Sequence, residues 1–437
     1  MISRTALPQL KLSLKTLQLL KQETEYSAGG FEPVPAFFAK AEGVRLWDVD
    51  GKEYLDFIAM FSAVNTGHRH PYILQKVVEQ LQTATLFNLA THNTLWPPFA
   101  EMICRRFGYD KVIAMTSGTE AADTACKIAR KWGLQVKGIA PNDCVVFGVG
   151  QSYHGLGSGV WPLMDPSPRR KAYGLDCNQS VMNVNPSSGS SLGYLDLEAM
   201  RRCLQEHHSR TAGVIMECFH GSARTVEEEW AYARGVYDLC KAHNILFIAD
   251  EVRAGAGKTG KFCSYQHLGD DCKPDIVTMG KSVTGGFYPQ SFILGTKAVM
   301  ALVGSNQTAS TYAMAPLAIA AAQATIEVID REHLMDRAVE LGDRWKAVVA
   351  SWNHPKVNYV ACVGADSNLF LKGTPGPRLA AMCLHKGVLT YPRPDGLRLS
   401  FPMTMTTEEL EHGAALIREA LDEVDQYDTI PGEHYPF

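Results

Sequence analysis

Three short segments of the chain carry groups that could do chemistry together, and the first is Thr116–Ala121. Its small hydroxyl and glycine residues lie between an expected strand and an expected helix. Such a loop leaves backbone N–H groups at a helix N-terminus, where phosphate can bind. A Ser-Gly-Thr sequence is also a common loop and N-cap, so the phosphate interpretation needs support from the other two segments.

The second segment is an apolar run that ends at Asp250. Ligands of open α/β sheets bind beyond the carboxyl ends of the strands. A carboxylate in apolar surroundings needs a cationic partner, because its pKa otherwise rises. A protonated ring nitrogen would be such a partner. A helix N-cap or an internal salt bridge would explain the same aspartate.

The third segment contains Lys281, which follows an apolar run and precedes Gly285 and Gly286. A lysine amine near apolar walls and other cations can have a lowered pKa and act as a Schiff-base nucleophile. An isolated lysine is more often a solvated surface residue. The order of phosphate loop, aspartate and lysine in one α/β chain favours the chemical interpretation.

The elements that must position these groups follow from the apolar pattern. Short apolar runs occupy residues 111–115, 143–147, 212–216, 245–249 and 275–279, and helices are expected after Ser117 to about Trp132 and over 228–243. The runs are continuous and not alternating, which is typical of strands buried on both faces. They predict an α/β fold with a largely parallel sheet between helices.

The two ends of the chain have a different pattern. Alternating runs flank Asp50-Gly51, a strong hairpin signal. From about residue 331, helical patterns alternate with short strands at 368–371 and 397–401. We therefore expect an N-terminal extension over 1–30, a small α+β domain formed by 31–75 and 331–437, and a large domain over 76–330.

Composition excludes several classes of protein. Hydrophobic residues make up 46% of the 437 residues, which argues against a disordered chain. The net charge is -4 without a basic block, so we expect no nucleic-acid surface, and no window is apolar enough to predict a membrane span. The 11 cysteines show no CxxC spacing, which predicts reduced thiols in an intracellular protein and no metal site.

The first residues allow two interpretations. Four basic residues and no acidic one precede Glu23, and Leu10, Leu14 and Leu17 would share one face of a helix. The segment could be a mitochondrial presequence, or a helix that packs on the body or on a partner subunit. It is poor in arginine and serine, so we expect the second possibility and a cytoplasmic protein.

From about Tyr26 to about residue 425, the sequence resembles the fold-type I pyridoxal-phosphate enzymes, specifically the class III aminotransferases, and most of all the ornithine aminotransferases. The motifs that carry the resemblance are Leu46-Trp47-Asp48, Ser62-Ala63-Val64-Asn65, Gly67-His68-Arg69-His70-Pro71 and the regions 124–133 and 250–286. The resemblance implies a large domain with a mostly parallel seven-stranded sheet, a smaller α+β domain, and pyridoxal 5'-phosphate (PLP) as the cofactor.

The resemblance also implies roles for the cofactor contacts. Lys281 would form the internal aldimine and move the proton between Cα and C4′. Asp250 would keep the pyridine nitrogen protonated, so that the ring withdraws electrons. Val252 would pack on one face of the ring, and Tyr153, followed by His154, would stack on the other.

Phosphate and substrate contacts follow in the same way. Ser117, Gly118 and Thr119 would form the phosphate loop. Ser310 and Thr311 would contact the phosphate of the neighbouring subunit, which implies a homodimer with active sites at its interface. Arg398 would hold a substrate α-carboxylate through a bidentate pair.

This sequence departs from the family pattern at its substrate contacts. Ornithine aminotransferases have tyrosines at the positions of Phe31 and Phe61 and an arginine at the position of Leu156. The changes remove two hydroxyls and a cation, so a diamino acid would lose partners for its distal ammonium group, at a cost of a few kcal/mol.

Two further departures change charges. Ser222 replaces the glutamate that pairs with the carboxylate-binding Arg398 in the family, which would leave that arginine open to carboxylates. Arg253 replaces a glutamine near the phenolic oxygen of the cofactor, where a full positive charge would favour the phenolate.

We therefore expect a PLP-dependent aminotransferase that acts on an amino acid or ω-amino compound with a more apolar side chain than ornithine. Its partners would be a small-molecule amino donor and a keto acceptor, with no nucleic acid and no membrane. Alternatives are a racemase, decarboxylase or aminomutase on the same scaffold, a true ornithine aminotransferase with drifted contacts, and a non-catalytic scaffold protein.

Overall fold

The computed structural model describes residues 10–30, 33–87, 89–175 and 179–434. Phe31, one of the predicted substrate contacts, lies outside the described residues. The chain divides into two compact units. The larger unit comprises Pro71–Gly257 and Lys261–Arg331, and the smaller unit comprises the chain up to His70, Lys258–Gly260 and Glu332 onward.

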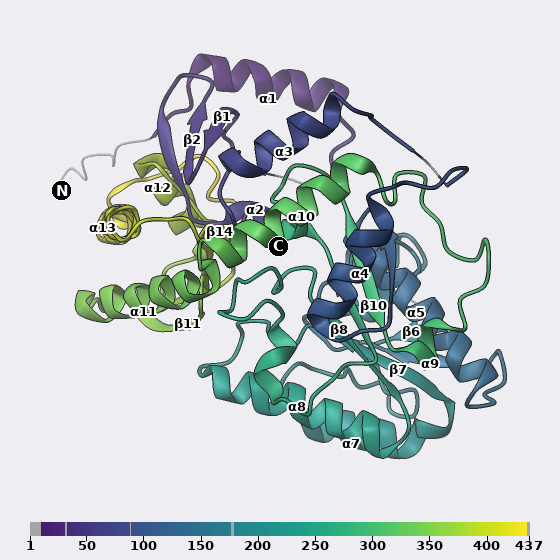
Figure 1. Cartoon of the computed structure of the whole chain (residues 1–437). Coiled ribbons are helices and arrows are strands. Elements are labelled where there is room, and N and C mark those ends of the chain that lie inside the picture. Colours follow the sequence, from purple (N-terminus) through teal and green to yellow (C-terminus); the bar gives the residue numbers. More distant parts are fainter. Residues whose placement is uncertain (1–9, 31–32, 88, 176–178, 435–437) are drawn as a thin grey trace. The chain divides into compact units, whose positions relative to one another are not determined.

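The larger unit contains a seven-stranded sheet in the order β4-β10-β9-β8-β7-β5-β6 (Figure 1). The strands are β4 (Lys111–Met115), β5 (Val145–Phe147), β6 (Val181–Met182), β7 (Thr211–Met216), β8 (Leu246–Asp250), β9 (Ile276–Met279) and β10 (Ser291–Gly295). The neighbouring strands β9, β8, β7, β5 and β6 run parallel to one another, whereas β10 is antiparallel to both β9 and β4. The mostly parallel α/β fold is confirmed, and the five apolar runs form β4, β5, β7, β8 and β9.

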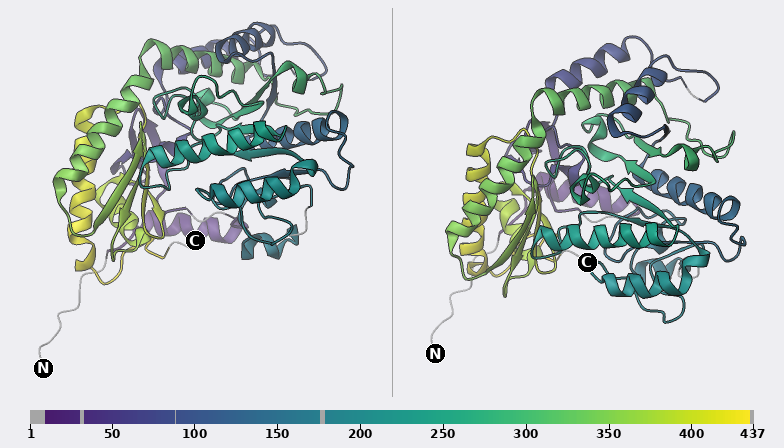
Figure 2. Two further views of the ribbon diagram at one scale, coloured as in Figure 1. Left: turned by 90° about the horizontal axis from the view of Figure 1, so that it is seen from below. Right: turned by 60° about the horizontal axis from the view of Figure 1, so that its bottom comes forward.

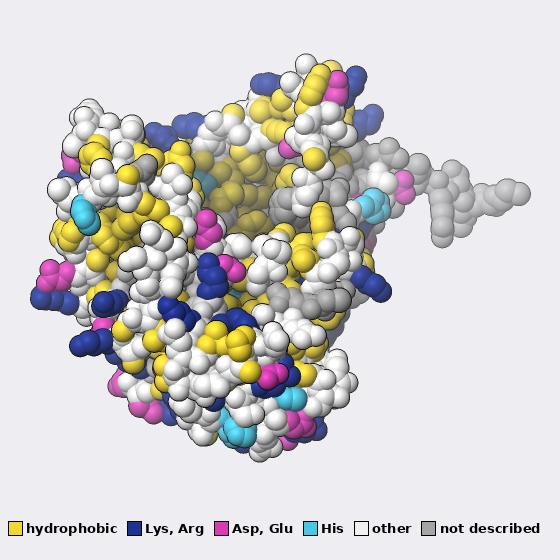
Figure 3. Space-filling view, turned by 90° about the vertical axis from the view of Figure 1, so that its right-hand side faces the viewer, with side chains coloured by type: hydrophobic (Ala, Val, Ile, Leu, Met, Phe, Trp, Pro, Cys, Tyr) yellow, Lys and Arg dark blue, Asp and Glu magenta, His cyan; other side chains and the backbone are white. Residues whose placement is uncertain are grey.

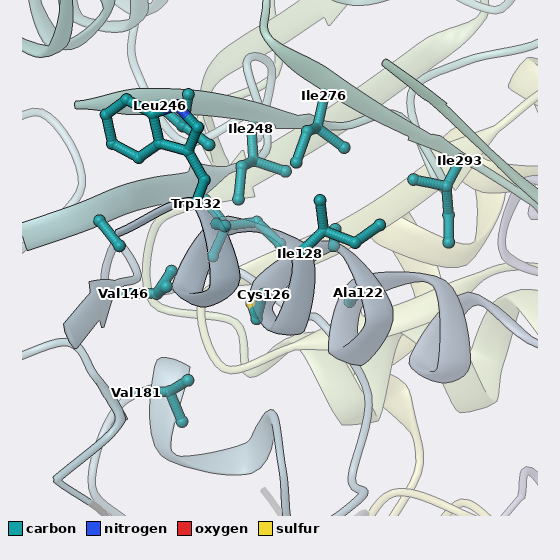
Figure 4. Packing of buried hydrophobic residues seen from close by; sticks show 14 of the residues in the cluster. Ala122, Cys126, Ile128, Trp132, Val146, Val181, Leu246, Ile248, Ile276 and Ile293 are labelled. Carbon is teal, nitrogen blue, oxygen red and sulfur yellow. The ribbon is translucent and has the colours of Figure 1, made fainter. Parts of the chain in front are cut away.

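Helix α5 (Gly118–Gln135) covers one face of this sheet, as Figure 4 shows. Alternate strand residues, among them Ile248, Ile276 and Ile293, share one buried cluster with Ile128 of α5. On the other face, the ring of Tyr237 in α8 (Val226–Ala242) lies 5.5 Å from that of Phe247. The sheet therefore buries both faces, which explains why its strands are continuously apolar.

The larger unit has six further α-helices among its described residues. They are α3 (Pro71–Leu81), α4 (Trp96–Phe107), α6 (Pro168–Ala172), α7 (Leu197–His207), α9 (Lys297–Met300) and α10 (Pro316–Arg331). Helices α7 and α8, drawn in teal, lie side by side in Figure 2. Helix α10 packs against α3 and against the short turn that begins at Lys281.

The register of the parallel strands decides which residues meet at the edge of the sheet. Met216 pairs with Ala249, and Asp250 pairs with Thr278. The carboxyl ends of β7, β8 and β9 therefore meet at one edge. The residues that follow these ends are the ones from which a site can be built.

The smaller unit contains two four-stranded sheets, in the orders β1-β2-β3-β13 and β11-β12-β15-β14. Their strands are β1 (Phe38–Glu42), β2 (Arg45–Asp48), β3 (Glu53–Asp56), β11 (Val357–Val363), β12 (Asp366–Leu371), β13 (Val388–Leu389), β14 (Tyr391–Arg393) and β15 (Gly396–Ser400). The hairpin predicted at Asp50-Gly51 is confirmed, because β2 and β3 pair antiparallel around it and Gly51 has a φ of 83°. Helices α11 (Leu334–Trp352), α12 (Gly376–Lys386) and α13 (Thr407–Glu423) pack together; Figure 2 shows α11 in green and α13 in yellow.

The N-terminal segment forms helix α1 (Leu14–Tyr26), capped by the hydroxyl of Ser13. Leu14 is 86% exposed and Leu17 is 48% exposed. Leu10, the third residue of the predicted apolar stripe, lies before the helix, and Leu14 and Leu17 are exposed on the single chain.

Lys, Arg, Asp and Glu side chains are interspersed on the face shown in Figure 3. Within the described part of the chain, no helix is long and apolar enough to cross a membrane. The ten cysteines that the structure describes are all free.

Candidate active site

The N-terminus of α5 forms the predicted phosphate loop. The hydroxyl of Ser117 accepts a hydrogen bond from the N–H of Glu120, and the Glu120 carboxylate accepts from the N–H groups of Thr116 and Ser117, at 2.7 and 3.2 Å. This capping box fixes the start of the helix. The N–H groups of Gly118 and Thr119 belong to the first turn, which has no acceptors inside the helix, so they can bind an anion.

Close packing brings two other loops against this turn. A Cβ atom on Gly118 would lie 2.7 Å from Cγ1 of Val252. A Cβ atom on Gly155 would lie 2.0 Å from Oγ1 of Thr119, and the φ of Gly155 is 104°. Both positions therefore require glycine, and the loops after β5 and β8 contact the phosphate loop directly.

Asp250 is 2% exposed and is held by groups from three segments. Its Oδ2 lies 2.6 Å from Nδ1 of His154, while its Oδ1 accepts hydrogen bonds from Oγ1 of Thr278 at 3.0 Å and from the N–H of Val252 at 3.1 Å. Nε2 of His154 is buried and has no hydrogen-bond partner among the described residues. The internal pairing considered as an alternative for Asp250 is thus present, and it fixes the direction of the carboxylate.

Lys281 has an unusual backbone conformation. It follows β9 directly after Gly280 and has a φ of 46°, in the left-handed region that side chains other than glycine disfavour. Such a conformation costs about 1–3 kcal/mol and clusters at functional sites. A Cβ atom on Gly280 would lie 3.3 Å from Cγ1 of Val252, so the backbone just before Lys281 packs against the loop that follows Asp250.

Glu217, which the sequence analysis missed, lies at the same edge. It follows β7 and is 2% exposed. Its Oε1 accepts a hydrogen bond from Nε of Arg253 at 2.9 Å, and Nη2 of Arg253 donates to the carbonyl of Phe219 at 2.5 Å. The signal that could have found it is an acidic residue directly after a buried strand, as at Asp250.

This ion pair corrects the expected charge at Arg253. Burial by itself would raise the pKa of Glu217, but the charges of Arg253, His220 and His154 lower that pKa to about 2. Glu217 is therefore ionised and compensates the guanidinium charge. The Arg253–Glu217 pair is therefore net neutral, and the positive charge predicted for Arg253 is offset by a carboxylate 2.9 Å away.

The loop that carries Ser222 is held by a second buried acid, Glu229 at the start of α8. The Glu229 carboxylate accepts hydrogen bonds from four successive N–H groups, those of His220, Gly221, Ser222 and Ala223, at 2.7, 2.9, 2.6 and 2.9 Å. The hydroxyl of Ser222 bonds to Nδ1 of His220. The position of Ser222 is therefore rigidly defined.

Four other predicted residues of the larger unit are located as follows. Tyr153 and Leu156 are 56% and 52% exposed. The hydroxyl of Ser310 lies 2.6 Å from that of Thr116 in its own chain, and Thr311 follows it in an exposed segment. The contribution of Ser310 and Thr311 to a second subunit stays a prediction.

In the smaller unit, Arg398 and Phe61 share a neighbour that the sequence analysis missed. Tyr391 of β14 pairs with Arg398 of β15, and its ring packs edge-on against that of Phe61, with 4.7 Å between centroids. Phe61 belongs to the turn Ala59–Ser62, whose residues all have φ values between 45° and 64°. A predicted carboxylate-binding residue and a predicted apolar contact thus lie beside one aromatic ring.

The family model described as aminotransferase class-III matches residues 26–421. This chain belongs to the class III aminotransferases. The match covers both compact units and all the described site residues named above.

Individual members of the family extend over nearly the whole chain. An ornithine aminotransferase of Schizosaccharomyces pombe is 35% identical over 433 residues, which cover 97% of this aminotransferase and 98% of that protein. An ornithine aminotransferase of Emericella nidulans is 33% identical over 418 residues, 94% and 91% of the two chains. The crystal structure of acetylornithine aminotransferase from Elizabethkingia anophelis superimposes with a TM-score of 0.81 at 30% identity and covers 93% of this chain and 99% of that one.

Class III aminotransferases depend on PLP, and the residues of this aminotransferase fit that cofactor. The glycines at 118 and 155 keep side chains out of the phosphate turn. The buried Asp250 carboxylate can hold a protonated ring nitrogen. Lys281 supplies an amine next to the strand of Asp250, and the helix N-terminus can bind the phosphate.

Proposed function

We propose that this class III aminotransferase acts on an amino acid or ω-amino compound whose side chain is more apolar than that of ornithine. The observation that supports this proposal most directly is the packing of Phe61 on Tyr391, the strand neighbour of Arg398. An aromatic wall next to a carboxylate-binding arginine favours a substrate with a carboxylate and an apolar remainder. Leu156 and Phe31 support the same inference from the sequence.

The larger unit would bind the cofactor and carry out proton transfer. When bound, PLP supplies an electron sink for carbanion chemistry. Lys281 would hold the cofactor covalently, release it to the incoming amine and then move the proton at the substrate Cα. Asp250, fixed by His154, would keep the ring nitrogen charged, while Tyr153 and Val252 would flank the ring.

The smaller unit would select the substrate. Arg398 would bind the α-carboxylate of the amino donor and of the keto acceptor through paired hydrogen bonds. Ser222 stands where the family has the glutamate that pairs with this arginine, so Arg398 would need no displacement step before binding. A distal ammonium would meet no acidic partner at Phe31, Phe61 or Leu156, and diamino acids should bind weakly.

Transamination of ornithine itself is the first alternative, since the relatives named above are ornithine aminotransferases. A racemase, decarboxylase or aminomutase is the second, supported by the replacement of a glutamine by Arg253 and of a glutamate by Ser222. These differ in their products, because only transamination converts the cofactor to its amine form and releases a keto compound.

An amino-donor screen read from the cofactor absorbance tests the proposal. Apolar amino acids and ω-amino compounds should bleach the lysine-bound form within seconds to minutes, and ornithine should do so far more slowly. Equal or faster bleaching by ornithine would contradict the apolar specificity. Exchange of the Cα proton, or release of CO2, without a keto product would favour the second alternative.

The assembly and location are also proposals. We infer a homodimer whose active sites lie at the interface, because the family resemblance assigns Ser310 and Thr311 to the neighbouring subunit. The scattered cysteines and the arginine-poor N-terminus favour the cytoplasm. Size-exclusion chromatography with light scattering tests the first point.

A further inference from the structure

One carboxylate, that of Glu217, joins two loops that come from different strands. Its Oε2 accepts a hydrogen bond from the N–H of Tyr153 at 3.2 Å, and its Oε1 accepts one from Nε of Arg253 at 2.9 Å. We propose that Glu217 is a positioning residue that sets the width of the slot for the cofactor ring. The proposal rests on the proposed function, in which Tyr153 and Val252 form the two walls of that slot.

The order of the strands explains why this residue can join the loops. Strand β7 lies between β5 and β8 in the sheet. Tyr153 lies in the loop after β5, and Arg253 lies in the loop after β8. Glu217 follows the central strand of the three, so its two carboxylate oxygens can reach the loops of both neighbours. Among the described strands, only β7 ends between these two loops, because β5, β7 and β8 are consecutive in the sheet.

The same two loops are also held by packing. Gly155 contacts Thr119, and Val252 contacts Gly118, both at distances that leave no room for an added Cβ. The turn at the start of α5 and the Glu217 carboxylate therefore each contact both loops. With both connections made, the separation of Tyr153 and Val252 is fixed before a ligand binds.

Arg253 is held in place by its own contacts, so its bond to Glu217 fixes the loop after β8 relative to that carboxylate. Its guanidinium carbon lies 5.6 Å from the ring centroid of Phe219, and its Nη2 donates to the Phe219 carbonyl. The Arg253 side chain is 7% exposed and the Glu217 side chain 3% exposed. Removing either partner of a charge pair this deeply buried would destabilise the fold, because the remaining charge would be buried and uncompensated.

The charges around Glu217 favour its ionised form. His154, His220 and Arg253 contribute positive potential, and they lower the pKa of Glu217 to about 2 against the effect of burial. The carboxylate therefore stays ionised at neutral pH and keeps accepting from both loops.

Three variants test the proposal, with one control. Glu217→Ala removes both connections. Glu217→Gln with Arg253→Gln removes both charges and leaves no buried ion without a partner. Asp275→Asn is the matched control. Asp275 pairs with Lys241 at 2.8 Å and accepts a hydrogen bond from the N–H of Phe247, and it lies at the opposite edge of the sheet from Glu217. The single variant Arg253→Gln shows whether the arginine acts on its own.

Two measurements are made on the full chain. Hydrogen exchange of the cofactor-free protein reports on the segment 150–156, whose Tyr153 N–H is bonded to Glu217. A fluorescence titration with PLP and the visible circular dichroism of the bound form report on the slot. We expect Glu217→Ala to speed exchange in 150–156 and to weaken PLP binding by on the order of tenfold or more. Asp275→Asn should change neither.

Each outcome decides the proposal. A folded Glu217→Ala protein with wild-type exchange, PLP affinity and circular dichroism would overturn it. If Glu217→Ala does not fold, Glu217→Ala with Arg253→Ala takes its place, because it removes both connections and leaves no buried ion without a partner. Wild-type values there would overturn the proposal equally. Failure of the wild-type protein to bind PLP would contradict the proposed function, whereas unchanged exchange in the variants would contradict the positioning role alone.

Discussion

Nδ1 of His154 lies 2.6 Å from Oδ2 of Asp250, with both side chains buried at the edge of the seven-stranded sheet. The histidine belongs to the loop after β5 and the aspartate to the end of β8. Their contact, together with the bond from Thr278, fixes the carboxylate direction without using all of its acceptor positions. An acceptor position therefore stays open for a further cationic donor, which is the role that we propose for the ring nitrogen of PLP.

Replacing Lys281 tests the central assignment. In Lys281→Ala, borohydride should no longer trap the cofactor on the protein, and turnover should fall by about 10²–10⁴ because the general base is lost. Mass spectrometry after reduction measures the trapping. Lys261→Ala, at an exposed lysine that bonds to the Gln266 carbonyl, serves as the control. Wild-type trapping in Lys281→Ala would refute the assignment.

Replacing Asp250 tests the electrostatic role of the carboxylate. Asp250→Asn keeps the shape but cannot carry a negative charge, so kcat should fall by about 100-fold or more. His154→Gln should have a smaller effect, since it changes the orientation of the carboxylate and keeps its charge. Stopped-flow measurement of the first half-reaction compares the two. The reverse order of severity would contradict the proposed division of roles.

Replacing Arg398 tests substrate recognition. Arg398→Leu should weaken α-carboxylate substrates by ~2–4 kcal/mol, since it removes one partner of a charged pair. Amines without a carboxylate should keep their reactivity. The ratio of kcat/KM values for an amino acid and for the matching amine measures the effect. An unchanged ratio would remove Arg398 from the substrate site.

The stability of the protein should depend on pH through Glu217. The pKa of its carboxyl is lowered from 4.5 to about 2, so the folded state binds fewer protons than the unfolded state between these values. The stabilisation is therefore complete above about pH 4.5 and is lost as the pH falls through about 2. From ~1.4 kcal/mol per pKa unit, its size is on the order of 3 kcal/mol.

Urea unfolding at several pH values between 6 and 3 measures this dependence. The double variant Glu217→Gln with Arg253→Gln should lose less stability on acidification than the wild type. Asp275→Asn provides the comparison at the other end of the sheet. Parallel curves for the double variant and the wild type would show that Glu217 is not the group responsible.

The close contact at Gly155 gives a prediction about the phosphate turn. In Gly155→Ala, the added methyl would meet Thr119 at 2.0 Å, and the φ of 104° disfavours alanine. We expect a loss of PLP affinity and about 1–3 kcal/mol of stability. Gly138→Ala is the control, because its φ is also positive, at 71°, but nothing lies within 4 Å of the added atom. Equal effects of the two changes would show that backbone strain alone is responsible.

Much of the fold could be predicted because its signals are local. Buried parallel strands need continuous apolar residues, and the runs at 111–115, 245–249 and 275–279 satisfy that need within five residues each. The hairpin at Asp50-Gly51 is equally local, since one turn decides it. Strands β6 and β10 were not predicted. Strand β6 has only two residues, and β10 has an antiparallel neighbour on each side, whereas the sequence pattern predicted a largely parallel sheet.

Local sequence signals also identify only part of the candidate site. The sequence by itself determined the order of the phosphate loop, Asp250 and Lys281, because each is adjacent to the end of a strand or the start of a helix that can be read from the local pattern. Only the tertiary structure decided that Glu217 compensates Arg253, that Glu229 holds the Ser222 loop and that Tyr391 packs against Phe61 and pairs with Arg398. Those partners come from separate elements, and their meeting depends on strand order and register, which no local pattern encodes.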